Sequence, residues 1–337
     1  MLDDIRRALV ELSRPFSDTR THYCQVEAAT LDDGRCALAG AVLDDATLVA
    51  VLAGLTARFS TVRFEPAGVR VLRTAQPQTV AVGTNLTGLY AKASFLAEQV
   101  SQLLNGWLLE ILMTEGRWAF VRQSDGYLGW AYAPYLVPAH GCAFSHLVSA
   151  PVSLLHAEPH GSAPLVSRIM GGTAVAVDAI DAAWVHVVLA GDDAGWIPAA
   201  DVRAFSTLPH DTDTRRRQML ADAVRFIGVP YLWGGCSALG IDCSGFSQLL
   251  HRLAGVTLPR DADMQFDAGR PVAEPFEPGD LLFFGELGEK RSITHVALSL
   301  GGWHIIHSSR SRNGVRQDNV QAVEHLRETF VGARRFI

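Results

Sequence analysis

Asp242-Cys243-Ser244-Gly245-Phe246 stands directly before the apolar-periodic run 247–253. This order predicts a helix that begins at Cys243 with Asp242 as its N-cap, because a carboxylate there accepts hydrogen bonds from the unpaired N–H groups of the first turn. Those N–H groups and the helix dipole favour an anion, and they lower the pKa of a thiol from its usual value of about 8.5. We therefore expect an exposed, ionised Cys243 that acts as a nucleophile. The alternative is a buried structural cysteine, which is what most free cysteines are.

Two strand-like runs lie downstream, on either side of Gly301-Gly302, with His295 and His307 at their outer ends. They predict a β-hairpin, but a strict two-residue turn would place the two histidines on opposite faces of the sheet. A three-residue loop or one bulge pairs Ala297 with His307 and brings both rings to one face. A triad with His295 as general base and His307 as its orienting partner therefore predicts an irregular hairpin at residues 301–303. His304, between them, is expected to be a packed or surface histidine.

Zinc binding is the rival interpretation of Cys243, His295 and His307. The sequence shows no Cys-x-x-Cys or His-x-x-x-His pair and no evident fourth ligand. We therefore expect neither a metal nor another cofactor.

Several short motifs surround these residues in a fixed order. They are Tyr231-Leu232-Trp233-Gly234-Gly235, the Cys243 motif, Leu258-Pro259-Arg260-Asp261, residues 278–284, Thr294-His295-Val296-Ala297 and Ile306-His307-Ser308. Together they resemble the NlpC-type cell-wall cysteine peptidases, which are papain-like α+β enzymes. The resemblance implies hydrolysis of the bond between γ-D-Glu and the diamino acid, diaminopimelate or lysine, in peptidoglycan stem peptides.

The resemblance also implies roles for further residues. Tyr231 would bind the oxyanion together with the backbone N–H of Cys243. On sequence alone, the alternative is a core tyrosine before a Gly-Gly turn. Candidates for peptide contacts are Trp233, Asp242, Ser244 and Asp261.

Two copies of an aromatic hairpin precede the peptidase-like part. Trp118 and Trp130 in one copy have the same spacing as Trp184 and Trp196 in the other, and each pair flanks a glycine-containing turn. The pattern is similar to that of bacterial SH3-like barrels and predicts two of them, at residues 76–140 and 141–207. The first is the looser match, with Ala97 to Leu112 as an insertion or a long strand pair.

A murein-peptide recycling enzyme of this layout uses an acidic residue of its first SH3-like domain to bind the free amine of an N-terminal L-Ala. The resemblance implies Glu98 for this role, as a buried carboxylate with Tyr127 as its neighbour, and the alternative is an ordinary surface glutamate. A substrate without the amine would leave that carboxylate unpaired.

Residues 1–75 form a separate unit with two strands, a helix at Asp45 to Phe59 capped by Asp44 or Asp45, and a closing strand. This order predicts a small α+β module, faintly similar to BON-type domains through the segment 38–44. We interpret it as an accessory module without chemistry of its own. After a linker at 208–213, the peptidase-like domain occupies residues 208–337, with helices on one face of an antiparallel sheet.

Composition limits the function classes. A net charge of −6 argues against nucleic-acid binding. No signal-like N-terminus and no apolar run of eighteen residues is present, which predicts a cytoplasmic protein without a membrane span. An odd, scattered set of cysteines suits reduced thiols; it comprises Cys24, Cys36, Cys142, Cys236 and Cys243. No protein partner is evident, and the expected partner is a murein peptide. The rival functions are an amidase or acyltransferase acting on another amide or lipid, and a catalytically silent wall-binding protein.

Overall fold

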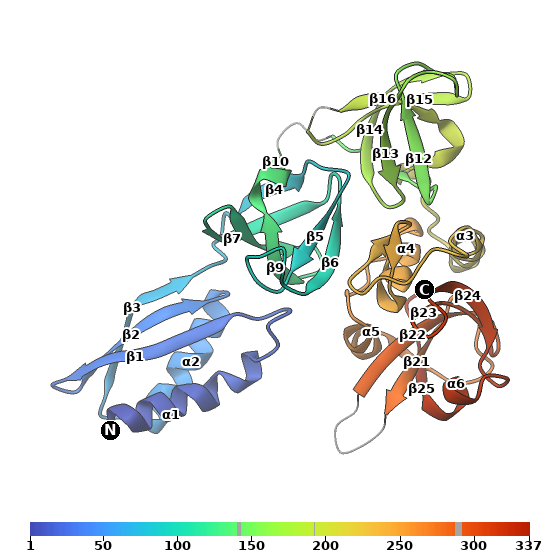
Figure 1. The fold of residues 1–337 in the computed structure, drawn as a ribbon. Coiled ribbons are helices and arrows are strands. Elements are labelled where there is room, and N and C mark those ends of the chain that lie inside the picture. Colours follow the sequence, from blue (N-terminus) through green and yellow to red (C-terminus); the bar gives the residue numbers. More distant parts are fainter. Residues whose placement is uncertain (140–142, 192, 287–291) are drawn as a thin grey trace.

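The computed structural model describes residues 1–139, 143–191, 193–286 and 292–337. Figure 1 shows four units along the chain: an N-terminal module (residues 1–75), a first barrel (76–139), a second barrel (143–207) and a C-terminal domain (208–337). Cys142 lies outside the described residues, and the other four cysteines are free thiols. Among the described helices, none has both the length and the apolar character needed to cross a membrane.

The N-terminal module is a three-stranded sheet packed against two helices. Its elements are α1 (Leu2–Leu12), η1 (Arg14–Phe16), β1 (Cys24–Asp32), β2 (Arg35–Val42), α2 (Asp45–Arg58) and β3 (Arg63–Val71). Strand β2 pairs with β1 antiparallel and with β3 parallel. The predicted cap of α2 is confirmed, since the Asp44 carboxylate accepts the N–H of Thr47 at 2.9 Å. The similarity to BON-type domains stays a prediction.

Helix α1 was absent from the predicted elements. It buries Ile5, Ala8 and Leu9, which have the i, i+3, i+4 spacing of one helix face. These side chains join Leu38, Val51 and Leu55 in the core of the module.

The first barrel is a seven-stranded sheet in the order β10-β4-β7-β8-β9-β5-β6. Its strands are β4 (Gln78–Val82), β5 (Leu86–Tyr90), β6 (Gln99–Leu104), β7 (Leu108–Glu115), β8 (Trp118–Gln123), β9 (Leu128–Tyr132) and β10 (Leu136–Pro138), with η2 (Ala133–Tyr135) before β10. The predicted hairpin is confirmed, with Trp118 opposite Tyr132. The looser segment between Ala97 and Leu112 holds β6 and the first part of β7, with a turn at Gly106 in the left-handed region (φ +75°) between them. The two strands pair with other strands of the sheet and not with each other, so the predicted strand pair is wrong.

The second barrel repeats the connectivity of the first, with strand order β17-β11-β14-β15-β16-β12-β13. Its strands are β11 (His146–Val148), β12 (Val152–His156), β13 (Leu165–Met170), β14 (Ala174–Asp181), β15 (Trp184–Val188), β16 (Ala194–Pro198) and β17 (Val202–Ala204), with η3 (Ala199–Asp201) and η4 (Phe205–Thr207). Its predicted hairpin is confirmed as well, with Trp184 opposite Pro198.

The C-terminal domain is built on an antiparallel sheet in the order β20-β25-β21-β22-β23-β24. Its helices are α3 (Thr212–Val224), α4 (Cys243–Leu253), α5 (Ala262–Ala268) and α6 (Glu324–Thr329). Its strands are β18 (Cys236–Ser237), β19 (Gly240–Ile241), β20 (Arg270–Val272), β21 (Leu281–Glu286), β22 (Ser292–Gly301), β23 (His304–Ser309), β24 (Gly314–Asn319) and β25 (Phe330–Arg335).

Both faces of this sheet are covered, and the prediction of helices on one face only is wrong. Along β21, Leu281 and Phe283 join the core that contains α3 and α4. Leu282 and Phe284 point to the other side, where they pack with Leu326 of α6. Successive strand residues alternate between faces, so the continuous apolar run of β21 indicates a strand buried on both sides.

Candidate active site

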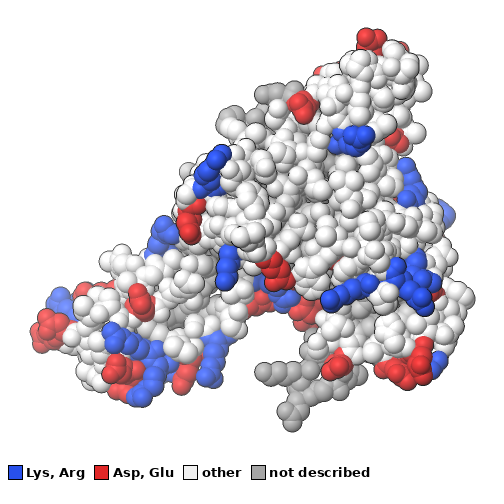
Figure 2. All heavy atoms as spheres, viewed as in Figure 1, with Lys and Arg blue, Asp and Glu red and all other residues white. Residues whose placement is uncertain are grey.

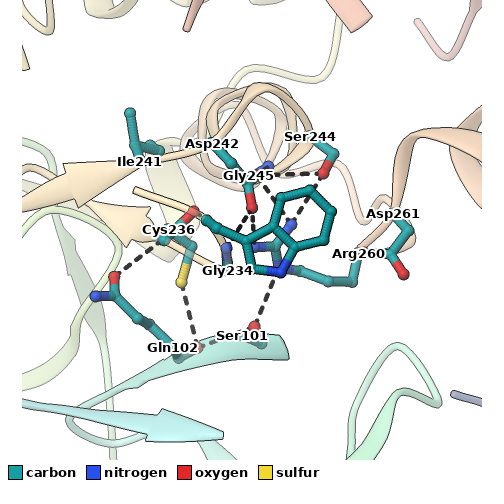
Figure 3. Close-up of polar contacts among 12 residues, drawn as sticks. Ser101, Gln102, Gly234, Cys236, Ile241, Asp242, Ser244, Gly245, Arg260 and Asp261 are labelled. Atoms are coloured by element: carbon teal, nitrogen blue, oxygen red, sulfur yellow. Dashed lines mark hydrogen bonds and ion pairs between the residues drawn. The ribbon is translucent and has the colours of Figure 1, made fainter. Parts of the chain in front are cut away.

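Asp242 caps the helix that carries Cys243, as the sequence predicts. Its Oδ1 accepts the N–H of Gly245 at 2.7 Å, and its Oδ2 accepts the N–H of Gly234 at 2.9 Å. The carboxylate therefore fixes the start of α4 and also the glycine turn that precedes it (Figure 3).

Arg260 holds this cap in place from below. It is 1% exposed, and its guanidinium contacts both oxygens of Asp242, at 3.1 and 2.6 Å. It also donates to Ser244 Oγ at 2.9 Å and to Ser101 Oγ of the first barrel at 3.1 Å. The side chains of Asp242 and Ser244 are thus engaged in internal hydrogen bonds. Sequence reasoning placed Arg260 in a motif but assigned it no role.

Cys243 lies under the sheet and is not an open thiol. Its residue exposure is only 8%, and it packs in the same core as Val296 of β22. Burial raises the pKa of the thiol to about 12, with a further contribution from Asp242, although the N–H of Val296 and Arg260 act in the opposite direction. The expectation of an exposed, ionised sulfur is therefore wrong, because β22 covers the helix start and removes the solvent that would stabilise a thiolate.

The hairpin that carries the two histidines is irregular, as predicted, but the irregularity lies at Leu300, just before the predicted residues 301–303. Leu298 pairs with Ile306 and Ser299 with Ile305, but Gly301 pairs with His304, so Leu300 is an extra residue on β22. The bulge puts both rings on one face, where His295 Nε2 lies 2.6 Å from His307 Nδ1.

Asp318 on β24 extends the histidine pair. Its Oδ2 lies 3.0 Å from His307 Nε2 and forms an ion pair with Arg316, whose Nε also lies at 3.0 Å. The hydrogen bond from His307 and the positive charge of Arg316 hold the pKa of Asp318 below its usual value, although partial burial opposes them. Asp318 is therefore an ionised acceptor at neutral pH.

This chain of contacts sets the tautomers of both histidines. Ionised Asp318 accepts only, so His307 donates from Nε2, and a neutral His307 then accepts at Nδ1. His295 must donate from Nε2, which leaves its Nδ1 as the basic atom. Burial first, and then the neighbouring His307 and His325, hold the pKa of His295 well below 6.5. At neutral pH the ring is uncharged and ready to accept a proton.

Sequence reasoning missed Asp318 because its strand gives little signal. The segment Gly314-Val315-Arg316-Gln317-Asp318-Asn319 has one large apolar residue and no alternating pattern, so it resembles a loop. It is an edge strand of the sheet, where polar residues are common.

A cleft of about 540 Å³ opens in front of the histidines. It is lined by Tyr231, Trp233, Thr294, His295, His307, Ser309, Arg310, Ser311 and His325. Burial, and then the neighbouring Cys243 and Asp242, raise the pKa of Tyr231 above its usual value of 10. Tyr231 therefore keeps its proton and faces the cleft region as a hydrogen-bond donor.

Glu98 and Tyr127 have different hydrogen-bond partners. Glu98 is exposed, which agrees with the alternative of a surface glutamate, because it lies in the loop between β5 and β6. Its Oε1 accepts the Nε1–H of Trp233 at 2.8 Å, and Trp233 is 58% exposed at the cleft. Tyr127 is buried and donates its hydroxyl to Asp261 Oδ2 at 3.0 Å. The first barrel thus contacts the cleft rim through Glu98. Through Tyr127 it contacts Asp261, a carboxylate of the C-terminal domain.

Metal ligation finds no support in the side-chain positions. Over residues 1–139, 143–191, 193–286 and 292–337, no group of three or more His, Cys, Asp or Glu side chains is placed to hold an ion. His295 and His307 instead face each other within one hydrogen bond.

Comparison with known proteins agrees with this geometry. The "NlpC/P60 family" model matches residues 228–335, and the "Bacterial dipeptidyl-peptidase Sh3 domain" model matches residues 89–131. A gamma-D-glutamyl-L-lysine dipeptidyl-peptidase of Bacillus cereus is 28% identical over 70% of this chain and 75% of its own length. Its namesake in Bacillus subtilis is 43% identical, but over 27% of this chain and 31% of its own length.

A further relative matches a similar share of the chain, and a solved structure has the same fold. Dipeptidyl-peptidase 6 of Lysinibacillus sphaericus is 27% identical over 70% of this chain and 89% of its own length. The crystal structure of an NlpC/P60 family protein from Bacillus cereus superposes with a TM-score of 0.68 at 22% identity, covering 77% of this chain and 99% of that one, which shows the shared fold. Residues 228–335 therefore belong to the NlpC/P60 family of cysteine peptidases, and residues 89–131 are a bacterial dipeptidyl-peptidase SH3 domain.

Proposed function

We propose that the protein is a cysteine peptidase that hydrolyses the bond between γ-D-Glu and the diamino acid of murein peptides bearing a free N-terminal L-Ala. The observation that carries this proposal is the relay of His295, His307 and Asp318 on the strands that cover Cys243. The names of the relatives describe the same class of bond: two are gamma-D-glutamyl-L-lysine dipeptidyl-peptidases.

The resting site starts from neutral partners. Because burial keeps the Cys243 thiol protonated and His295 uncharged, attack begins with transfer of the thiol proton to His295 Nδ1. The sulfur then adds to the γ-carbonyl carbon of D-Glu. Ionised Asp318, acting through His307, stabilises the imidazolium that forms.

Breakdown of the tetrahedral intermediate returns the proton. Its oxyanion would be bound by the backbone N–H of Cys243 at the helix start and by the Tyr231 hydroxyl, each worth roughly 3 kcal/mol in such sites. His295 protonates the leaving amine of the diamino acid as the C–N bond breaks, which leaves a thioester on Cys243. Water, deprotonated by His295, then hydrolyses the thioester and releases L-Ala-γ-D-Glu.

Recognition of a free amine would come from carboxylates on the amino-terminal side of the cleft. We assign this role to Glu98, which accepts from Trp233 at the cleft rim, and to Asp261, which accepts from Tyr127 of the first barrel. A peptidase that requires this amine acts on released peptides and spares stem peptides still attached to glycan. This preference supports a role in recycling wall fragments in the cytoplasm.

The proposal is tested with the tripeptides L-Ala-γ-D-Glu-L-Lys and L-Ala-γ-D-Glu-diaminopimelate, each with a free and an acetylated N-terminus. We expect the wild-type protein to release L-Ala-γ-D-Glu from a free tripeptide, detected by mass spectrometry, and Cys243→Ala to release none. Equal turnover of free and acetylated peptides would contradict amine recognition. Failure to cleave any of the four would contradict the peptidase assignment itself.

A further inference from the structure

Arg20 joins the N-terminal module to the C-terminal domain through a saturated set of ion pairs. Its Nε and Nη2 donate to Asp18 at 2.9 and 2.8 Å. Its Nη1 and Nη2 donate to Asp263 at 2.9 and 2.7 Å, and Nη1 also donates to Asp261 Oδ2 at 2.9 Å. All five guanidinium N–H groups therefore reach carboxylate oxygens, which is the most that an arginine can make.

The same residue contacts the first barrel beside Tyr127. The carbonyl of Arg20 accepts the N–H of Leu128 at 2.7 Å. Tyr127, the preceding residue, donates to the Asp261 oxygen that also accepts from Arg20. Three separate units of the chain thus meet at one carboxylate oxygen.

The side chain of Asp261 does not cap its own helix. The residue occupies the N-cap position of α5, but its side chain accepts no cap hydrogen bond. A capping carboxylate typically contributes about 1 kcal/mol to its helix. The side chain accepts instead from Arg20 and Tyr127. Figure 3 shows Asp261 next to Arg260 in the chain.

The junction borders a cavity. A space of about 490 Å³ lies between the N-terminal module and the first barrel, and Arg20, Tyr23, Val100 and Tyr127 are among its lining residues. Figure 2 shows a notch between the module and the C-terminal domain, with acidic and basic side chains at its head. Asp261 itself is 24% exposed by side chain, so it is within reach of solutes.

We propose that Arg20 is a specificity-determining positioning residue, through which the N-terminal module holds Asp261 against Tyr127 at the amino-terminal end of the substrate site. This inference rests on the proposed function for the role of Asp261 in binding the substrate amine. Under this proposal residues 1–75 are more than an accessory module, because Arg20 acts on substrate recognition through Asp261.

Electrostatics supports the same assignment. Asp261 is faced by Arg20 of the N-terminal module, Tyr127 of the first barrel, and Arg260 and Asp263 of its own segment, with Asp18 behind Arg20. Burial raises the pKa of Asp261, whereas the charges of Arg260 and Arg20 oppose this rise. Removal of Arg20 therefore raises the pKa of Asp261 further, and a larger fraction of the carboxyl group is protonated in mildly acidic solution.

The test compares Arg20→Ala with wild type on the free and the acetylated tripeptide. For the free peptide we expect KM to rise about tenfold with kcat nearly unchanged, the scale of one lost charge-assisted contact. The acid limb of kcat/KM should move to higher pH, whereas turnover of the acetylated peptide should change little. Arg20→Lys, which keeps the charge without the fork, should lie between the two. An unchanged KM and pH profile would overturn the proposal, and so would a lower KM, which would mean that Arg20 competes with substrate.

Two further measurements separate this inference from the proposed function. Arg58→Ala removes an exposed ion pair with Glu11 inside the same module and serves as the matched control, expected to behave as wild type. The carboxyl carbon of Asp261, labelled with ¹³C and assigned with Asp261→Asn, is titrated by NMR in wild type and Arg20→Ala without substrate. If neither peptide is cleaved by the wild type, the proposed function fails, and an unshifted Asp261 titration would separately overturn the positioning role.

Discussion

The two barrels share one strand order but meet the C-terminal domain differently. The first barrel sends side chains of β6 toward the nucleophile: Gln102 Oε1 accepts the Cys236 N–H at 3.0 Å, and Ser101 accepts from Arg260. The second barrel contacts the outer ends of the helices. Its Arg203 pairs with Asp222 of α3 at 3.1 Å and donates to the carbonyl of Leu253 at the end of α4.

This difference shows that the strand order of a barrel does not determine what it does. The function of each barrel depends on which polar side chains its facing strands carry and on what those side chains contact. We expect changes at the first barrel interface to alter catalysis, and changes of similar size at the second to alter stability alone.

The largest effect should come from Arg260→Met, which removes the link between the first barrel and the cap of α4. The buried Asp242 would lose its cationic partner, and breaking such a pair costs about 3–5 kcal/mol. Displacement of Cys243 by about an ångström would lower kcat/KM by roughly 100-fold in the protein that still folds. Chemical denaturation and peptide hydrolysis at a temperature where the variant is folded check both. Wild-type activity in the folded variant would contradict the expectation that changes at the first barrel interface alter catalysis.

Asp318→Ala changes the relay inside the C-terminal domain and leaves both barrel interfaces intact. Its effect on kcat therefore serves as a reference for the interface variants. In Asp318→Ala, His307 loses its acceptor, so His295 is no longer held in the tautomer with a basic Nδ1. We expect kcat to fall about 100-fold, as for loss of efficient general-base catalysis, with little change in KM. Asp318→Asn should retain part of the wild-type kcat, since an amide oxygen can still accept from His307 but carries no charge. Equal activities of the two variants and wild type would contradict the relay.

Arg203→Met tests the second barrel. The variant leaves the buried Asp222 with only Gln218 as a partner, and we expect a loss of about 3 kcal/mol in the free energy of unfolding. Because this contact lies away from the cleft, kcat/KM should stay within about twofold of wild type. Urea unfolding and the free-tripeptide assay measure the two quantities. A large drop in activity would show that both barrels act on the site, and the contrast between them would be lost.

The smallest effect is expected for Glu98→Gln at the cleft rim. Glu98 is exposed, and an exposed charge pair contributes less than about 1 kcal/mol, so KM for the free tripeptide should rise about threefold. Neither kcat nor the reaction of the acetylated peptide should change. The amide can still accept from Trp233, so the local contact is preserved and the charge alone is tested.

Local features of the site could be predicted from the sequence. The Asp242 cap and the bulged hairpin each follow from spacing within one or two elements, and both were predicted. The burial of Cys243 could not be predicted in this way, because it depends on β22 lying over the start of α4. The contact between Arg20 and Asp261 joins residues far apart in the chain, and nothing in their local sequence indicates it.

The missed elements differ in kind. Helix α1 carries a helical apolar spacing at Ile5, Ala8 and Leu9, so attention to that pattern would have found it. Strand β24, which supplies Asp318, is polar and lies at a sheet edge, so its assignment required the neighbouring strand.

The contacts of β6 determine which fragments of the protein can fold on their own. Ser101 and Gln102 accept hydrogen bonds from Arg260 and Cys236 inside the C-terminal domain, although they lie more than a hundred residues earlier in the chain. A fragment cut at residue 208 would expose the Cys236 N–H and one face of a buried guanidinium to an empty interface. The smallest autonomous folding unit that retains the nucleophile therefore includes the first barrel, and chimeras should exchange the two together.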